Sequence, residues 1–353
     1  MSATASALPN LLQNAKRVVW QALADWPGDD PLSTQDWLAR HFSAGCNWHV
    51  SHPVNEVQGA AIETALWQPL RHAMPRLERR TDILLSGCFT HEGDVDAVWV
   101  AVTGHYLGGF EHALFGIAPT GRPAALRFGE FYRVVDGRIV ECRVLLDFID
   151  LMRQAGRAVL PASNGAAGVV PGPRHHDGML LAPQDDTVSR ASLGLVEAMI
   201  FGLHRFDGAN LASMGMAGFW HPRMLWYGPG GIGTTIGIEG FQSQHQKPFL
   251  HAFADRQGGN HRARIGEGAF VASTGWPSIH ATHAGSYLGT PATDRRITMR
   301  VMDWWRCEGG LLVENWVFID LPHLFLQMGV DLFARCHTPT PIPSTEPTGG
   351  PST

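Results

Sequence analysis

A carboxylate within a strand-like run is the first residue of this sequence that could do chemistry. The run ITMRVMDWW contains Asp303. On a β-strand alternate side chains share a face, so Asp303 would lie between Val301 and Trp305. Such apolar neighbours disfavour the charged form and raise the carboxyl pKa towards the range of a general acid or base. Asp303 is therefore the leading candidate for acid/base catalysis.

The same carboxylate has an ordinary structural role open to it. Arg300 and Arg306 are near enough along the strand to pair with Asp303 if its side chain lies on the outer face. One interpretation places a carboxyl group inside a cavity, and the other places an ion pair at the surface. Both stay open at this point.

The segment around Asp303 occurs twice in the chain. Residues 300–327 align without a gap with residues 127–154, and each copy is predicted to be two strands, a tight turn and a helix. Glu130 occupies the position of Asp303 in the first copy, and Cys142 occupies that of Asn315. The residues shared by the two copies are Arg127/Arg300, Arg133/Arg306, Gly137/Gly310, Val140/Val313, Glu141/Glu314, Val144/Val317, Asp147/Asp320, Leu151/Leu324 and Gln154/Gln327. Both acids are candidates, and the second copy carries the richer polar set.

The tight turn in the second copy leaves two strand registers open. A two-residue turn would place Asp303 opposite Trp316. A three-residue loop with Gly310 as a left-handed bulge would place it opposite Asn315. In the second register Asn315 would donate a hydrogen bond beside Asp303, and Glu314 would face away from the interior.

Two histidines are candidate partners for Asp303. His280 and His283 are three residues apart on a predicted strand, so they face opposite ways and make a poor metal pair. Either one could form an acid/base couple with the carboxylate. The alternative is a buried core histidine without a catalytic role. We expect no metal and no cofactor.

Aromatic residues supply candidate substrate contacts. Trp226 and Tyr227 precede the glycine-rich turn GPGGIG, which lacks the Lys-Ser/Thr end of a phosphate-binding loop. Trp276 precedes a proline at another predicted turn, Trp305 shares the face of Asp303, and His245 lies on a predicted covering helix. All five are predicted to contact a substrate, although aromatic residues commonly pack the interior instead.

Composition restricts the class of protein. The chain has 353 residues with 44% hydrophobic and 17% charged residues, which suits two globular domains. A formal net charge of −5 argues against nucleic acid or an anionic membrane as partner. The five cysteines form no CxxC pair, and the N-terminus lacks the features of a secretory signal. A cytoplasmic location follows from these features.

The order of predicted elements is the same in both halves. Each begins with an amphipathic helix, near residues 9–26 and 188–206, and continues through further helices to several antiparallel strands. We predict a first domain at 1–157, a Pro/Gly-rich linker at 158–187 and a second domain at 188–336. The Pro/Thr-rich residues 337–353 are predicted to be disordered. This is an α+β pattern, with helices collected on one side of a curved sheet.

Four short motifs carry a resemblance to a known family. They are Thr282-His283-Ala284-Gly285, Leu288-Gly289, Arg300-Val301-Met302-Asp303 and Val313-Glu314-Asn315-Trp316. Together they resemble the SnoaL-like polyketide cyclases of the nuclear-transport-factor-2-like superfamily. The resemblance covers most of 190–336 and, more weakly, 10–157. It implies two tandem cone-shaped barrels, each a curved antiparallel sheet with helices, whose open ends bind small apolar molecules.

The resemblance also implies where chemistry would occur. The family's three cone positions fall on Asp303, where the family often has histidine, on Asn315, in place of the histidine of an E-H-W motif, and on Val317, in place of the acid/base aspartate. Val317 is thus expected to line the substrate pocket, and the family mechanism does not transfer unchanged. Asp303 would act as acid or base with a histidine as partner and Asn315 as polariser of a substrate oxygen.

The function expected is cofactor-independent acid/base chemistry, of the cyclase, isomerase or lyase type, on an apolar ring-containing molecule in the second cone. A hydrolase or dehydratase that positions a water is one alternative. A non-catalytic binding or dimerisation module is the other. The two cones are expected to pack sheet against sheet as an internal pseudo-dimer, and a homo-oligomer is possible.

Overall fold

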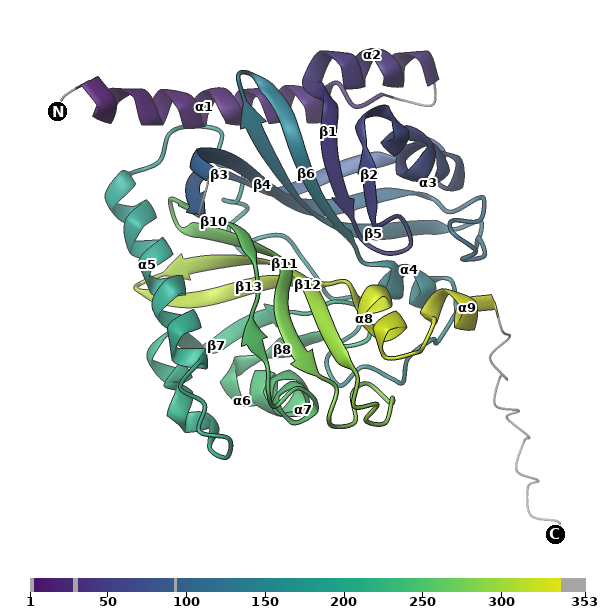
Figure 1. The fold of residues 1–353 in the computed structure, drawn as a ribbon, viewed down its shortest axis with the longest axis vertical. Coiled ribbons are helices and arrows are strands. Elements are labelled where there is room, and N and C mark those ends of the chain that lie inside the picture. The colour runs from purple at the N-terminus through teal and green to yellow at the C-terminus, as the bar shows by residue number, and fades with distance from the viewer. Residues whose placement is uncertain (1–2, 28–30, 92–93, 338–353) are drawn as a thin grey trace, which may run out of the picture.

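The structure, a computed structural model, describes residues 3–27, 31–91 and 94–337. Two sheets, each with its own helices, lie one above the other in Figure 1. We call elements α1 to α4 the N-terminal half and elements α5 to α9 the C-terminal half. The α+β fold with two tandem units is as predicted.

The N-terminal half contains a six-stranded sheet in the order β2-β1-β6-β5-β4-β3. Its elements are α1 (Ala3–Ala24), α2 (Pro31–His41), β1 (Phe42–Val50), β2 (Glu56–Gln58), η1 (Gly59–Ala61), η2 (Glu63–Trp67), α3 (Gln68–Ala73), β3 (Glu78–His91), β4 (Asp94–Gly109), β5 (Pro123–Val135), β6 (Arg138–Leu146) and α4 (Phe148–Gln154).

The C-terminal half repeats this plan with the order β10-β11-β12-β13-β7-β8, and a short β9 pairs with β11. Its elements are α5 (Asp186–Leu203), η3 (Leu211–Met214), η4 (Met216–Gly218), β7 (Trp220–Tyr227), β8 (Thr234–Ile236), α6 (Gly237–Phe241), η5 (Gln242–Gln246), α7 (Lys247–Ala252), β9 (Gln257–Gly258), β10 (His261–Glu267), β11 (Phe270–Thr282), β12 (Arg296–Glu308), β13 (Leu311–Ile319), α8 (Leu321–Gln327) and α9 (Leu332–His337).

Each sheet is mixed, which corrects the expectation of a wholly antiparallel one. β1 runs parallel to β6, and β7 runs parallel to β13. In both halves the first strand of the half, β1 or β7, lies beside the last strand of an antiparallel meander, β6 or β13, and the two strands run in the same direction. Sequence periodicity does not reveal this pairing, because it is made between strands about 90 residues apart.

The two sheets pack face to face, as the sequence led us to expect. Trp304, Trp316 and Phe318 of one sheet and Trp99 and Phe131 of the other are buried in one shared apolar cluster. Because each sheet is therefore covered on both faces, its strands read as nearly continuous apolar runs rather than as clean alternation.

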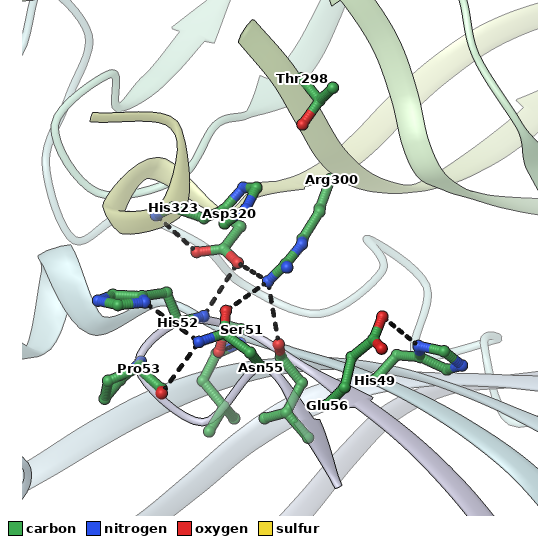
Figure 2. A network of polar contacts seen from close by, with 12 residues as sticks. His49, Ser51, His52, Pro53, Asn55, Glu56, Thr298, Arg300, Asp320 and His323 are labelled. Atoms are coloured by element: carbon green, nitrogen blue, oxygen red, sulfur yellow. Dashed lines mark hydrogen bonds and ion pairs between the residues drawn. The ribbon is translucent and has the colours of Figure 1, made fainter. Parts of the chain in front are cut away.

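A pair of residues retained in both copies clamps the two halves together. Asp320 accepts hydrogen bonds from Arg300 Nη1 (3.1 Å), from the backbone N–H of His52 (3.0 Å) and from His323 N at the start of α8 (3.2 Å). Figure 2 shows Arg300 also reaching Asn55, on the loop after β1. One aspartate thus caps its own helix and holds a loop of the other half.

The first copy makes the same clamp in the opposite direction. Asp147 caps α4 and accepts hydrogen bonds from Arg127 Nη1 (3.3 Å) and from Gly230 N (2.9 Å), on the loop after β7. The repeated arginine and aspartate are therefore explained by packing between the halves, and Arg300 is not available as a partner for Asp303.

The segment between the halves joins both sheets rather than hanging free. Met179 forms a parallel bridge with Leu84 at the edge of β3, and Ala166 forms an antiparallel bridge with Thr234 of β8. The predicted boundaries at 157 and 188 stay predictions. The predicted disordered tail lies outside the described residues, apart from His337 at the end of α9. Among the described helices, none is both long enough and apolar enough to span a membrane.

Candidate functional site

The hairpin of β12 and β13 carries Asp303, Trp305, Asn315 and Val317, and both registers predicted for it are wrong. Glu308 pairs with Leu311 across a two-residue turn, but the register then shifts between Arg306 and Cys307. As a result Asp303 lies directly opposite Val317. The bulge keeps Asn315 on the same face as Asp303, diagonally across the hairpin.

Asp303 lies on the inner face of its sheet, the face covered by α5, α6 and α7. The side chains on either side of it, Val301 and Trp305, and the opposite residue, Val317, pack in the apolar cluster of that face. Burial raises the carboxyl pKa to about 7, against smaller opposing effects of the hydrogen bond from Asn315 and the charge of Arg264. The interior interpretation of Asp303 is therefore the one that the structure supports.

The surface ion-pair alternative is wrong for a second reason. The Arg306 guanidinium donates to Asp177 and Glu308 instead.

Asn315 Nδ2 donates to Asp303 Oδ1 (3.4 Å) and to the backbone carbonyl of Trp304 (3.0 Å). Asn315 therefore orients the Asp303 carboxyl and has both amide hydrogens engaged, which does not fit its expected role as polariser of a substrate oxygen.

A row of polar side chains crosses the sheet at the level of Asp303. Arg264 of β10 is in register with Ser273 of β11, and Ser273 is in register with Asp303. Ser273 is 3% exposed, and its Oγ lies 3.4 Å from His261 Nδ1. Burial first, then the Arg264 and His204 charges, lower the pKa of His261 to about 4. A cation, a hydroxyl and a neutral imidazole thus accompany the carboxyl.

Aromatic residues form a wall of the same inner face. The rings of Trp226 and His245 are stacked with centroids 4.2 Å apart, and Phe241 lies against both. Burial lowers the pKa of His245 to about 3, so this imidazole is neutral near pH 7. Trp305 belongs to the same cluster. Trp226, His245, Trp305 and Val317 therefore share one interior, and their contact with a substrate stays a prediction.

Two predicted substrate contacts lie elsewhere. Tyr227 faces the other sheet, where its Oη donates to Glu314 (3.1 Å). Trp276 also lies between the halves, with the guanidinium of Arg143, on β6 of the N-terminal half, 5.5 Å from its ring centroid. Both residues therefore lie away from the interior that contains Asp303. Aromatic side chains suit a buried interface as well as a pocket, and their sequence context does not distinguish the two.

Neither candidate histidine reaches Asp303. His280 is exposed and pairs with Thr298, roughly 20 Å along the strand from Ser273. His283 follows the end of β11, is fully buried, and has Nδ1 3.0 Å from Thr293 Oγ1. The predicted histidine–aspartate couple is not formed.

Glu130 is placed as its duplication predicts but is fully engaged. It lies opposite Val144 on the inner face of the first sheet, just as Asp303 lies opposite Val317. Both carboxylate oxygens accept hydrogen bonds from Arg79, and Tyr106 Oη (2.8 Å) and Tyr132 Oη (2.5 Å) add two more. The carboxylate oxygens of Glu130 are therefore occupied by protein donors and are not open to a substrate.

The residues around the two acids differ at several equivalent positions. At positions equivalent by strand register, Ser273 and Arg264 correspond to Val102 and Leu84 in the first half. In the π-helical turn before the proline-containing helix, His245 and Gln246 correspond to Leu66 and Trp67. At these four positions the C-terminal half carries polar groups where the N-terminal half has apolar side chains, whereas the N-terminal half has Arg79, Tyr106 and Tyr132 around its own acid.

Several polar atoms on this inner face have no partner within the part of the chain that the structure describes. They are Trp220 Nε1, Thr235 Oγ1, Gln246 Oε1, Arg264 Nε and Trp305 Nε1. Buried polar groups are normally hydrogen-bonded, so these atoms are open to water or to a ligand. Sequence reasoning missed Arg264, Ser273 and His261. The signal available in the sequence was the alternation of polar and apolar residues around Arg264, which indicates one face of a strand.

The family can now be stated from the comparisons. The model of the SnoaL-like polyketide cyclase family matches residues 33–155 and 210–328, which together exceed half of the chain. The chain belongs to the SnoaL-like polyketide cyclase family. It contains two tandem copies of the family's domain. None of the curated proteins compared with it matches.

Solved structures similar to the chain include three bacterial proteins. AclR, a putative hydroxylase from Streptomyces galilaeus, is 22% identical over 40% of this chain and 82% of its own, with a TM-score of 0.33. IdmH, a putative polyketide cyclase from Streptomyces antibioticus, is 23% identical over 38% and 98%, with a TM-score of 0.31. A putative SnoaL-like polyketide cyclase from Jannaschia Sp. CCS1 is 21% identical over 40% and 89%, with a TM-score of 0.32.

Proposed function

We propose that the C-terminal half is a cofactor-independent acid/base enzyme that acts on an apolar, ring-containing small molecule. The observation that carries this proposal is the Asp303 carboxyl group. It lies in an apolar and aromatic interior and has a pKa of about 7. A general acid/base works best when its pKa is close to the working pH. Family membership supports a small molecule as the substrate.

In the proposed reaction Asp303 takes a proton from a carbon next to a carbonyl group and returns it at a second position. Asn315 holds the carboxyl in place through the 3.4 Å hydrogen bond to Oδ1. The indole N–H of Trp305, which shares the face of Asp303 and has no partner among the described residues, is the donor to the substrate oxygen. Such a donor stabilises the negative charge that develops on that oxygen.

The charge of Arg264 contributes to the same end. It lowers the Asp303 pKa, although less than burial raises it, and so favours the anion that must form when the carboxyl acts as a base. The N-terminal half has Glu130 but binds it to an arginine and two tyrosines. We therefore assign the activity to the C-terminal half alone.

Turnover tests the proposal. Small aromatic ketones, lactones and epoxides would be screened against the wild type, Asp303→Asn and Glu130→Gln, with circular dichroism as the check on folding. We expect Asp303→Asn to lower turnover of any accepted compound by roughly 10²–10⁴-fold, while a folded Glu130→Gln retains it. Equal turnover by the wild type and Asp303→Asn would remove Asp303 as the acid/base group.

The products of the same screen separate the other candidates. Addition of water to an epoxide or lactone would indicate the hydrolase, in which Asp303 and Asn315 position a water. Binding without turnover of any compound would indicate a non-catalytic binding module.

A further inference from the structure

Two surface cavities occupy equivalent places in the two halves. The larger, of about 720 Å³, is in the C-terminal half, and the smaller, of about 520 Å³, is in the N-terminal half. Met216, Ala217 and Lys247 are among the residues that line the larger.

The equivalence follows from the elements that line each cavity. The larger lies between the helical turns before β7 and the helix after β8, and the smaller lies between the helix before β1 and the turn after β2. The helix after β8 and the turn after β2 each begin at a glycine in the left-handed region, Gly237 (φ 70°) and Gly59 (φ 57°). An opening that recurs at the same place in both copies belongs to the fold and is not an incidental hollow.

The larger cavity adjoins the interior that contains Asp303. Met216 lines it and also belongs to the apolar cluster that includes Trp305 and Val317. Met214 of the same cluster contacts Gln246, whose Nε2 lies 3.9 Å from the methionine sulfur. Methionine side chains are unbranched and change rotamer readily, so they form a barrier that can move aside.

Charge differs between the two openings. Lys247 is the single charged residue lining the larger cavity, is exposed, and forms no ion pair within the described residues. Arg138 is the charged residue of the smaller opening, but its guanidinium donates to the backbone carbonyls of Ala39, Arg40 and Phe42. The larger opening therefore presents a cation with no ion-pair partner among the described residues, whereas the cation of the smaller opening is already bound to backbone carbonyl groups.

We propose that the larger cavity is the entrance to the Asp303 interior and that Lys247 selects ring-containing molecules that carry an anionic group. The apolar ring enters past Met216, and the carboxylate or other anion stays at the opening on the Lys247 ammonium. This inference rests on the proposed function in that the ring must reach the Asp303 interior.

Calorimetric titration with two matched probes tests the selection. 2-Naphthoate and the neutral 2-naphthamide have the same ring and differ in charge. We expect the wild type to bind the carboxylate at least about 5–10-fold more tightly. Lys247→Gln should abolish that preference and Lys247→Arg should restore it. Equal affinities in the wild type, a preference that survives Lys247→Gln, or no binding of either probe would overturn the proposal.

The entrance itself is tested with substitutions that fill each cavity. Ala217 and Ala44 are exposed and line the larger and the smaller cavity respectively. Ala217→Trp should weaken binding of both probes at least 10-fold, while the matched control Ala44→Trp should leave both affinities unchanged. Weaker binding by Ala44→Trp together with unchanged binding by Ala217→Trp would place the entrance in the N-terminal half and contradict the proposal.

Chemical labelling gives an independent readout. The chain has two lysines, Lys16 and Lys247, and Lys16 is only 2% exposed. An amine-reactive acetylating reagent should therefore modify Lys247 alone among the lysines, and 2-naphthoate should slow this modification while 2-naphthamide does not. Equal protection by both would contradict the ion pair. Asp303→Asn should keep the carboxylate preference, so that its turnover result tests the proposed function separately.

Discussion

Asp303 is unusual because its folded environment favours the protonated form near neutral pH. Its pKa rises from 3.8 to about 7, with burial as the main cause. The folded state then holds a proton that the unfolded chain releases above pH 4. The contribution of Asp303 to the free energy of unfolding is therefore largest below pH 4 and is lost as the pH rises through 7.

Substitution with a neutral isostere should remove this dependence. We predict that the stability of Asp303→Asn relative to the wild type increases from pH 4 to pH 8, by about 2–4 kcal/mol. Urea unfolding at a series of pH values measures it. A difference that does not change with pH would show that Asp303 ionises normally in the folded protein.

The sequence could predict which residues of its own strand share a face with Asp303, but neither whether that face is the interior nor which residues of other strands lie beside it. Alternation along one strand placed Asp303 with Trp305. The residue opposite Asp303 depends on a bulge between Arg306 and Cys307, which no local signal reveals. Arg264 and Ser273 reach the site only through pairing between separate strands, so the sequence did not connect them with it.

His283 shows how a plausible catalytic residue can be structural. Its backbone N–H and carbonyl bond the same loop positions as those of Phe110 in the first half. It therefore occupies a core position that holds phenylalanine in the other copy. A histidine in a family motif had suggested chemistry, whereas the duplicated backbone bonding indicates packing.

At the scale of elements, β5 of one sheet and β12 of the other lie in close contact at Gly129 and Trp304. A Cβ added at Gly129 of β5 would lie 2.8 Å from Cη2 of the Trp304 indole and 3.1 Å from Cδ2 of Phe318. Trp304 is fully buried between the sheets, so its ring has little room to move. The absence of a side chain at Gly129 is what allows β5 and β12 to approach.

Gly129→Ala should accordingly destabilise the protein by about 1–3 kcal/mol through overpacking. Gly194 of α5 is the control, because it is an exposed helical position where an added Cβ meets nothing within 4 Å. Gly194→Ala should stabilise by up to about 1 kcal/mol. Thermal unfolding of both variants checks the pair, and a neutral Gly129→Ala would contradict the tight sheet packing.

Across the whole molecule, a buried ion pair joins the first helix to the second sheet. Lys16 Nζ of α1 lies 2.5 Å from Glu267 Oε1 of β10, and both side chains are buried. The second carboxylate oxygen of Glu267 accepts the backbone N–H of Ser86 (2.7 Å). Burial raises the Glu267 pKa, and these hydrogen bonds oppose the rise. Three segments of the chain therefore meet at one carboxylate.

Lys16→Met should leave this carboxylate buried without its cation and destabilise the protein by about 3–5 kcal/mol. Loss of the cation raises the Glu267 pKa further, so the deficit should grow as the pH increases through that pKa. Arg296→Met is the control, since its pair with Asp255 is exposed, and should cost less than about 1 kcal/mol. Similar losses in both variants would show that the buried pair does not hold the halves together.

The architecture of the molecule was the most predictable level. The gapless repeat and matching element order predicted two tandem α+β units, and the family resemblance implied that they pack sheet against sheet. The sequence could not show which repeated residues serve packing. Asp147 and Asp320, shared by both copies, each cap a helix and bind a loop of the other half, which explains their retention without catalysis.

The protonation of Asp303 is the property on which the functional account depends, and infrared spectroscopy measures it directly. The carboxyl C=O absorption in the difference between wild type and Asp303→Asn would be followed from pH 4 to pH 9. We predict a single band that disappears with a midpoint near pH 7. A midpoint near pH 4, the ordinary value for an aspartic acid, would contradict the account.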